Sequence, residues 1–121
     1  MEKIFLDTNI FIDINERRDM KLIESLISHK LYISVITLGT WAYVYKHSIP
    51  LSKPEQLINT FNFVDATSDI AKKSLFGPTN DFEDNVQLHS ASDSNCNTFV
   101  TKDAKLLKLG YFGKVRICDS L

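Results

Sequence analysis

Short apolar segments alternate along the chain with segments in which apolar residues recur at helical spacing. The apolar segments contain many β-branched and aromatic residues and are predicted strands at 3–6, 31–36, 63–65, 98–100 and 115–118. Helical spacing or helix-start residues predict helices at 10–14, 22–27, 37–45, 55–61, 68–75, 81–91 and 104–109. This alternation predicts an α/β fold, a three-layer α/β/α sandwich with a mostly parallel central sheet and helices on both faces.

Polar residues, glycines and prolines mark the expected ends of these elements. The polar stretch 15–19 separates the first two helices, and Thr37 is the expected N-cap of the helix after the second strand. Gly77-Pro78 and Gly110 each end a helix. With 121 residues, 44% of them apolar, we expect one domain over 1–121.

The formal charge gives no general attraction for a polyanion. The 14 Lys and Arg residues and the 15 Asp and Glu residues sum to −1. Any contact with nucleic acid therefore needs a local basic patch, and the last twenty residues contain such a cluster, which is otherwise interpreted as a solvated surface. Its members are Lys102, Lys105, Lys108, Lys114 and Arg116.

Neither the start of the chain nor its cysteines indicate a membrane or an oxidising compartment. The first apolar run is interrupted by Asp7 after three residues, which is too short for a signal peptide or a membrane span. Cys96 and Cys118 lack the spacing of a redox or zinc motif. We therefore expect a cytoplasmic protein with reduced thiols and no membrane contact.

Three aspartates follow strands or begin helices. Asp7 and Asp103 lie just beyond the ends of predicted strands, where parallel α/β sheets form their binding crevice, and Asp84 lies in the first turn of a helix. Each could serve only as a helix cap or favourable first-turn charge. Together, however, they would repel one another unless a divalent cation neutralised them. The pattern favours a Mg²⁺ or Mn²⁺ site, because these ions prefer oxygen ligands.

Four motifs in this order resemble the PIN-domain family over nearly the whole chain. They are Leu-Asp-Thr-Asn at 6–9, Asp-Phe-Glu-Asp at 81–84, Ala91, and Val-Thr-Lys-Asp at 100–103. The resemblance implies a PIN-like fold and a metal-dependent endoribonuclease, often the VapC-like toxin of a toxin–antitoxin pair. It also implies RNA as substrate, a small antitoxin protein as inhibitory partner, and a homodimer as the assembly.

The resemblance also assigns roles to residues. It implies that Asp7, Asp84 and Asp103 are catalytic metal-site acids and that Asn9 and Thr101 are supporting polar residues. The family commonly has a Glu early in the helix after the second strand, whereas this chain has Thr40 there. A hydroxyl cannot supply that charge, so the resemblance leaves catalysis open at this position.

The neighbouring acids give one candidate replacement for the missing charge. Asp81 is three residues before Asp84, at a spacing that places both on one helix face, and is therefore the substitute metal ligand that we expect. Glu83 is expected to face solvent instead.

Three basic residues are candidates for contact with RNA or with a protein partner. Arg17 and Arg18 follow the first helix and could reach phosphates near the crevice or an acidic antitoxin segment. Lys102 adjoins Asp103. His29, His47 and His89 lack the placement of metal ligands.

Two other functions compete with the nuclease. The first is a catalytically weakened PIN-like domain that binds RNA or a protein without cleavage, which Thr40 and the near-neutral charge favour. The second is a phosphoacceptor domain of the receiver type. It fits poorly, because such domains need an adjacent pair of acids after the first strand, and here Asp7 is followed by Thr-Asn.

Overall fold

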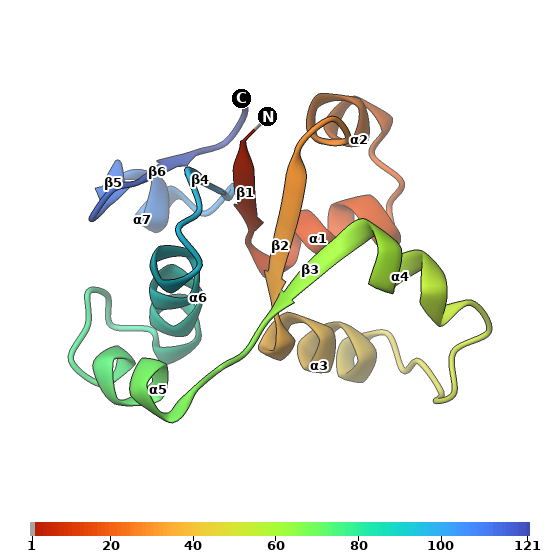
Figure 1. Ribbon diagram of the computed structural model, residues 1–121, viewed down its shortest axis with the longest axis horizontal. Helices are drawn as coiled ribbons and strands as arrows, with labels where there is room; N and C mark the ends of the chain where they lie inside the picture. The colour runs from red at the N-terminus through yellow and green to blue at the C-terminus, as the bar shows by residue number, and fades with distance from the viewer. Residues whose placement is uncertain (1) are drawn as a thin grey trace.

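A single six-stranded sheet forms the centre of the molecule, shown in Figure 1. The computed structural model describes residues 2–121. The strands are β1 (Lys3–Leu6), β2 (Lys30–Ser34), β3 (Phe61–Val64), β4 (Thr98–Val100), β5 (Tyr111–Phe112) and β6 (Val115–Cys118), in the sheet order β3-β2-β1-β4-β6-β5. All neighbouring strands are parallel except β5, which pairs antiparallel with β6. The mostly parallel sheet predicted from the sequence is confirmed.

Helices cover both faces of this sheet. They are α1 (Thr8–Asn15), α2 (Met20–Leu26), α3 (Val35–Val44), α4 (Pro54–Thr60), α5 (Ser68–Ser74), α6 (Phe82–Asp93) and α7 (Ala104–Leu107). The first four pack on one face, whereas α6 and α7 pack on the other and α5 packs against α6 (Figure 1). The three-layer arrangement predicted from the alternation of strands and helices is therefore confirmed.

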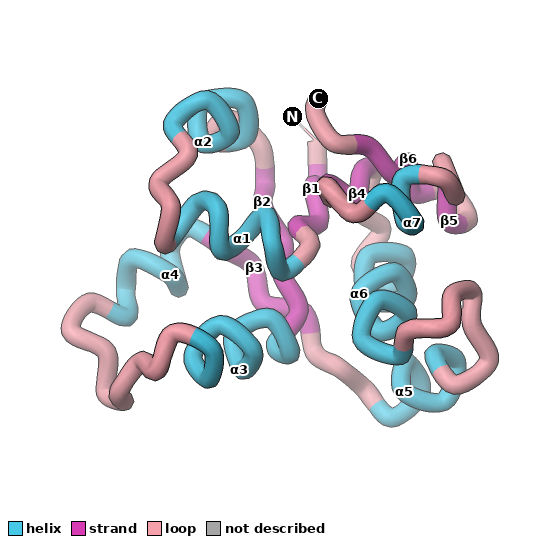
Figure 2. The backbone as a smooth tube through the Cα atoms, turned by 180° about the vertical axis from the view of Figure 1, so that it is seen from behind, coloured by secondary structure: helices cyan, strands magenta, loops and turns pink. Residues whose placement is uncertain are grey.

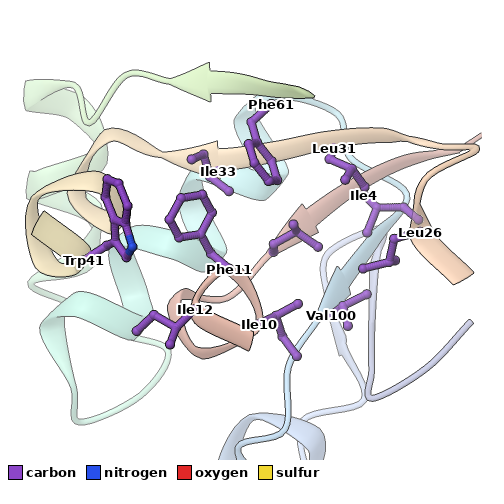
Figure 3. Packing of buried hydrophobic residues seen from close by; sticks show 11 residues of the cluster. Ile4, Ile10, Phe11, Ile12, Leu26, Leu31, Ile33, Trp41, Phe61 and Val100 are labelled. Carbon is purple, nitrogen blue, oxygen red and sulfur yellow. The ribbon is translucent and has the colours of Figure 1, made fainter. Parts of the chain in front are cut away.

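The alternation of side chains along β1 divides the interior into two apolar clusters. Ile4 and Leu6 point to the face covered by α1, and Phe5 points to the face covered by α6. In the first cluster, the ring of Phe11 lies at the centre, with its centroid 5.6 Å from that of Trp41 and 5.1 Å from that of Phe61 (Figure 3). This packing fixes α1, and with it the residue at its N-terminus, against the end of β1.

Several expected boundaries were wrong by one or two residues. The second strand, expected over 31–36, ends at Ser34. The helix α3 begins at Val35 instead of Thr37, because the hydroxyl of Ser34 accepts a hydrogen bond from the Ile36 N–H and caps it. Thr37 lies inside the helix and is fully buried. The third strand begins at Phe61, two residues earlier than expected, because Phe61 is buried in the first cluster and pairs with Leu31. The short strand β5 was not expected at all.

The parallel pairing brings the carboxyl ends of the two middle strands together. Leu6 at the end of β1 pairs with Val100 at the end of β4, and the Asp7 N–H donates to the Val100 carbonyl at 3.0 Å. Figure 2 shows α3 and α6 on opposite sides of the region where β1 ends. The segments that contain the three predicted aspartates thus meet at one edge of the sheet, as parallel topology requires.

None of the helices within residues 2–121 has both the length and the apolar character that a membrane crossing needs.

Candidate functional site

Asp7 is a buried carboxylate held by donors from three segments. Its side chain is only 5% exposed, and it caps α1 by accepting the Thr8 N–H on Oδ1 at 2.8 Å. Oδ1 also accepts the amide of Gln87 from α6 at 3.1 Å, and Oδ2 accepts the hydroxyl of Thr101 at 2.6 Å. Burial raises the pKa of Asp7 above its ordinary value, and the three hydrogen bonds oppose that rise.

These hydrogen bonds leave one oxygen of Asp7, Oδ2, able to accept a further contact. A carboxylate oxygen has two lone pairs, and Oδ1 uses both on Thr8 and Gln87. Oδ2 accepts only from Thr101 within the described residues, so one lone pair remains on that oxygen. A cation at Asp7 would therefore bind Oδ2 alone.

Asp84 and Asp103 complete the predicted acidic group. Asp84 lies in the first turn of α6, and no described side chain or N–H donates to its carboxylate. Asp103 caps α7, because its Oδ1 accepts the Lys105 N–H at 2.9 Å. The Asp103 N–H in turn donates to Thr101 Oγ1 at 3.0 Å, so Thr101 connects Asp7 to Asp103.

Charge repulsion and burial together act on Asp84. Burial is the largest cause that raises the pKa of Asp84 from 3.8 to about 6. The negative charges of Asp81, Asp7, Asp103 and Glu83, in that order, contribute the rest of this rise. The acids are thus close enough to oppose one another's ionisation. A cation placed among them would reverse this effect, because an opposite charge favours the ionised carboxylate.

The acids line one pocket of about 380 Å³ at this edge of the sheet. Among its described lining residues are five carboxylates and a single cation, Arg17, so the pocket is strongly negative although the chain is nearly neutral. A pocket of this charge repels a phosphate group unless a cation is present. The five acids are Asp7, Asp81, Glu83, Asp84 and Asp103.

The expected position of Glu83 was wrong. Instead of facing solvent, Glu83 is half-buried and lines the pocket, where its Oε1 accepts a hydrogen bond from the hydroxyl of Thr40 at 3.4 Å. Thr40 itself reaches the pocket from α3. Sequence spacing assigned Glu83 to the outer face of α6 because it could not show that α3 lies across the start of that helix.

Some of the predicted supporting and basic residues line the acidic pocket, and others lie outside it. Asn9 lines the acidic pocket and is exposed. Arg17 also lines it, and its guanidinium pairs with Asp13. Arg18 lines a different cavity beside Trp41, outside the acidic pocket. Lys102 likewise lines a cavity other than the acidic pocket.

A buried aspartate accounts for the direction of Lys102. Asp13 is only 6% exposed and pairs with both Lys102, at 3.3 Å, and Arg17. Lys102 also lies 3.9 Å from Asp19. These pairs connect the loop between β4 and α7 to α1, beside the site.

Sequence reasoning did not identify Gln87 or Thr37 as site residues. Gln87 is 1% exposed and donates to Asp7, and its Oε1 accepts from Thr37 at 3.5 Å. Thr37 also bonds to the hydroxyl of Thr8 at 3.0 Å, so α3, α6 and α1 share one polar network. Only the position of Gln87, three residues after Asp84 on α6, could have indicated this role. The ring of Tyr45, 37% exposed, lines the pocket.

The five carboxylates that line the pocket offer oxygen ligands, which suit a hard divalent cation. Within residues 2–121, no three His, Cys, Asp or Glu side chains are already gathered closely enough to enclose an ion. Mg²⁺ keeps several of its waters and binds through one or two carboxylates, so it does not need such an enclosure. The donor set therefore fits a partly hydrated Mg²⁺ or Mn²⁺ ion.

The histidines and thiols lie outside this pocket. His29 accepts the N–H of Glu2, His47 pairs with Glu16, and His89 bonds to the Gly77 carbonyl. Both cysteines are free.

Comparison with solved structures identifies the fold. No family model and no curated protein matches this sequence. A crystal structure of VapBC2 from Rickettsia felis bound to a DNA fragment from their promoter matches with a TM-score of 0.69 and 18% identity, over 95% of this chain and 96% of that one. A toxin–antitoxin complex from Klebsiella pneumoniae matches with 0.66 and 22%, over 93% and 94%. DNA-bound VapBC from Salmonella typhimurium matches with 0.54 and 23%, over 97% of both chains.

These likenesses define the fold class. The chain has the α/β fold found in toxin–antitoxin complexes. More particularly, its fold is like that of chains in VapBC complexes, which confirms the fold that the resemblance in the sequence implied.

The raised pKa of Asp84 predicts that removal of its charge stabilises the metal-free protein. Between 3.8 and about 6 the folded state binds more protons than the unfolded state, so this group lowers stability as pH rises through that range. In EDTA, Asp84→Asn should raise the melting temperature at neutral pH, and the gain should disappear as the pH falls to about 4.

Asp65→Asn, at an exposed acid outside the pocket, is the matched control for this measurement and should show no such dependence. An Asp84→Asn protein that is less stable than wild type at neutral pH would contradict the electrostatic interpretation.

Proposed function

We propose that the protein is a metal-dependent endoribonuclease that cleaves RNA phosphodiester bonds. The observation that carries the proposal is the acidic pocket, in which five carboxylates from three segments of the chain meet at the carboxyl ends of β1 and β4. Capping explains the backbone bonds of Asp7, Asp81 and Asp103. It does not explain why these capped helix ends lie together at the cost of mutual repulsion.

The residues that would hold Mg²⁺ or Mn²⁺ are Asp7 through Oδ2, Asp84 and Asp103, with Asp81 as a further candidate. When bound, the ion supplies charge neutralisation for a phosphate and a water of lowered pKa. Thr101 and Gln87 orient Asp7 and favour its ionised form by donating to its two oxygens. Asn9 offers a polar side chain at the pocket edge.

Arg17 is the basic residue best placed to contact the RNA. It is the one cation that lines the acidic pocket within residues 2–121, and its guanidinium is paired on one side with Asp13. Tyr45 at the same pocket offers a ring on which a base could stack. Arg18 and Lys102 lie outside the pocket, so we assign them to the outer path of the RNA or to a protein partner.

We further infer that the protein is the toxin of a toxin–antitoxin pair. The support is the VapC-like fold, since the similar structures are described as VapBC or toxin–antitoxin complexes. The partner would be a small antitoxin protein that blocks the acidic pocket. A homodimer is the assembly that we expect.

One observation favours a second function, binding without cleavage. Thr40 lacks a charge, and the carboxylates of the described residues do not already enclose an ion. A PIN-like domain with too weak a metal site would bind RNA or a protein partner and leave the RNA intact. The two functions differ in their response to metal.

A cleavage assay tests the proposal. Structured RNAs incubated with the protein and Mg²⁺ or Mn²⁺ should be cut, and EDTA should prevent cutting. Asp7→Asn and Asp84→Asn should each reduce cleavage to the level seen in EDTA, whereas Asp65→Asn should retain wild-type activity. Cleavage that persists in both site variants would refute the site assignment, and no cleavage with either metal would favour the binding function.

The role of Gln87 in holding Asp7 gives a separate prediction. Gln87→Met keeps the volume of the buried side chain but removes the donor to Asp7 Oδ1. Loss of such an indirect contact typically lowers metal affinity by about 10–100-fold. Titration calorimetry with Mn²⁺ measures this change, and the exposed Gln56→Met is the control. Equal Mn²⁺ affinities in the two variants would show that Gln87 does not act through Asp7.

A further inference from the structure

Two of the five acids of the pocket, Glu83 and Asp84, have no capping role. Asp7, Asp81 and Asp103 each accept a backbone N–H at the start of a helix. Within residues 2–121, the only hydrogen bond to the Glu83 carboxylate comes from Thr40, and no Lys, Arg or His forms an ion pair with it. Helix capping therefore gives no reason for Glu83 to face the pocket.

The direction of Glu83 is set from across the pocket. Glu83 and Asp84 are neighbours on α6 and are separated by about 100° around the helix axis, yet both line the pocket. They do so because α3 lies opposite the first turn of α6 and presents Thr40 to the Glu83 carboxylate at 3.4 Å. The Thr40 hydroxyl carries no charge, but it donates to the Glu83 carboxylate, which α6 supplies.

We propose that Glu83 is a further acidic residue of the metal site and that Thr40 is its positioning residue. The inference rests on the proposed metal-dependent function and extends it to a residue outside the predicted acidic group. In this arrangement α6 supplies the negative charge that faces α3, and α3 supplies only a hydrogen-bond donor. Position 40 is then compatible with a working site although it has no carboxylate.

An exchange of the charge between the two helices tests this inference. Glu83→Gln removes the charge with little change of shape and should lower the affinity for Mn²⁺ by about tenfold or more in titration calorimetry. Adding Thr40→Glu to Glu83→Gln places a carboxylate on α3 and should restore most of that affinity. Glu55→Gln, an exposed acid in the first turn of α4, is the matched control and should bind like wild type.

A second measurement tests the inference even if the protein with both Glu83→Gln and Thr40→Glu does not fold. Thr40→Val should weaken Mn²⁺ binding in the wild-type background and have little further effect in Glu83→Gln, because the two residues act together. The same variants should show a matching loss of Mn²⁺-induced thermal stabilisation.

The outcomes separate this inference from the proposed function. If wild type binds Mn²⁺ and Asp7→Asn does not, but Glu83→Gln binds like wild type, the inference is wrong and the proposed function stands. Independent effects of Thr40→Val and Glu83→Gln would also refute the positioning role. If wild type itself binds no Mn²⁺, the proposed function fails, and the inference fails with it.

Discussion

The carboxylate of Asp7 is almost fully buried at the end of β1. A buried carboxylate is tolerated only where enough hydrogen-bond donors surround it. The donors come from α1, from α6 and from the segment after β4, through Thr8, Gln87 and Thr101. Each of these segments must therefore keep its position relative to β1. The packing of α1 through Phe11 and the pairing of Leu6 with Val100 provide that constraint.

The same constraint explains why other acids gather beside Asp7. Helices begin where parallel strands end, and aspartates at helix starts satisfy free N–H groups and favour the positive end of the helix. Asp81 and Asp103 cap α6 and α7 in this way and face Asp7 across the pocket. The residues that cap these helices are thus among those that we propose to bind the cation. Burial and, after it, repulsion among the acids raise the pKa of Asp84, and a bound cation would remove the repulsion.

Local sequence pattern was sufficient for most of the fold and for the central part of the site. The strand 98–100 and the strand 115–118 have the predicted bounds, because short buried runs with clear turn residues on both sides have few alternatives. The placement of Asp7 and Asp103 followed from parallel topology. The start of α3 was misplaced, because Ser34 and Thr37 are both good N-caps and only the packed structure distinguishes them.

Contacts between distant helices could not be predicted from spacing. Gln87 reaches Asp7 across eighty positions of sequence, and Glu83 meets Thr40 across forty-three. A helical wheel places Glu83 on one side of α6, but it does not show which element lies there. Such residues are found only when the tertiary arrangement of α3 and α6 is known.

The most direct test of the account is a crystal structure of the protein grown with Mn²⁺, in which the ion is located by its anomalous scattering. The account predicts an anomalous peak in the acidic pocket, bonded to Oδ2 of Asp7 and close to Asp84. A well-ordered pocket without such a peak at millimolar Mn²⁺, or peaks only on the outer surface, would contradict it.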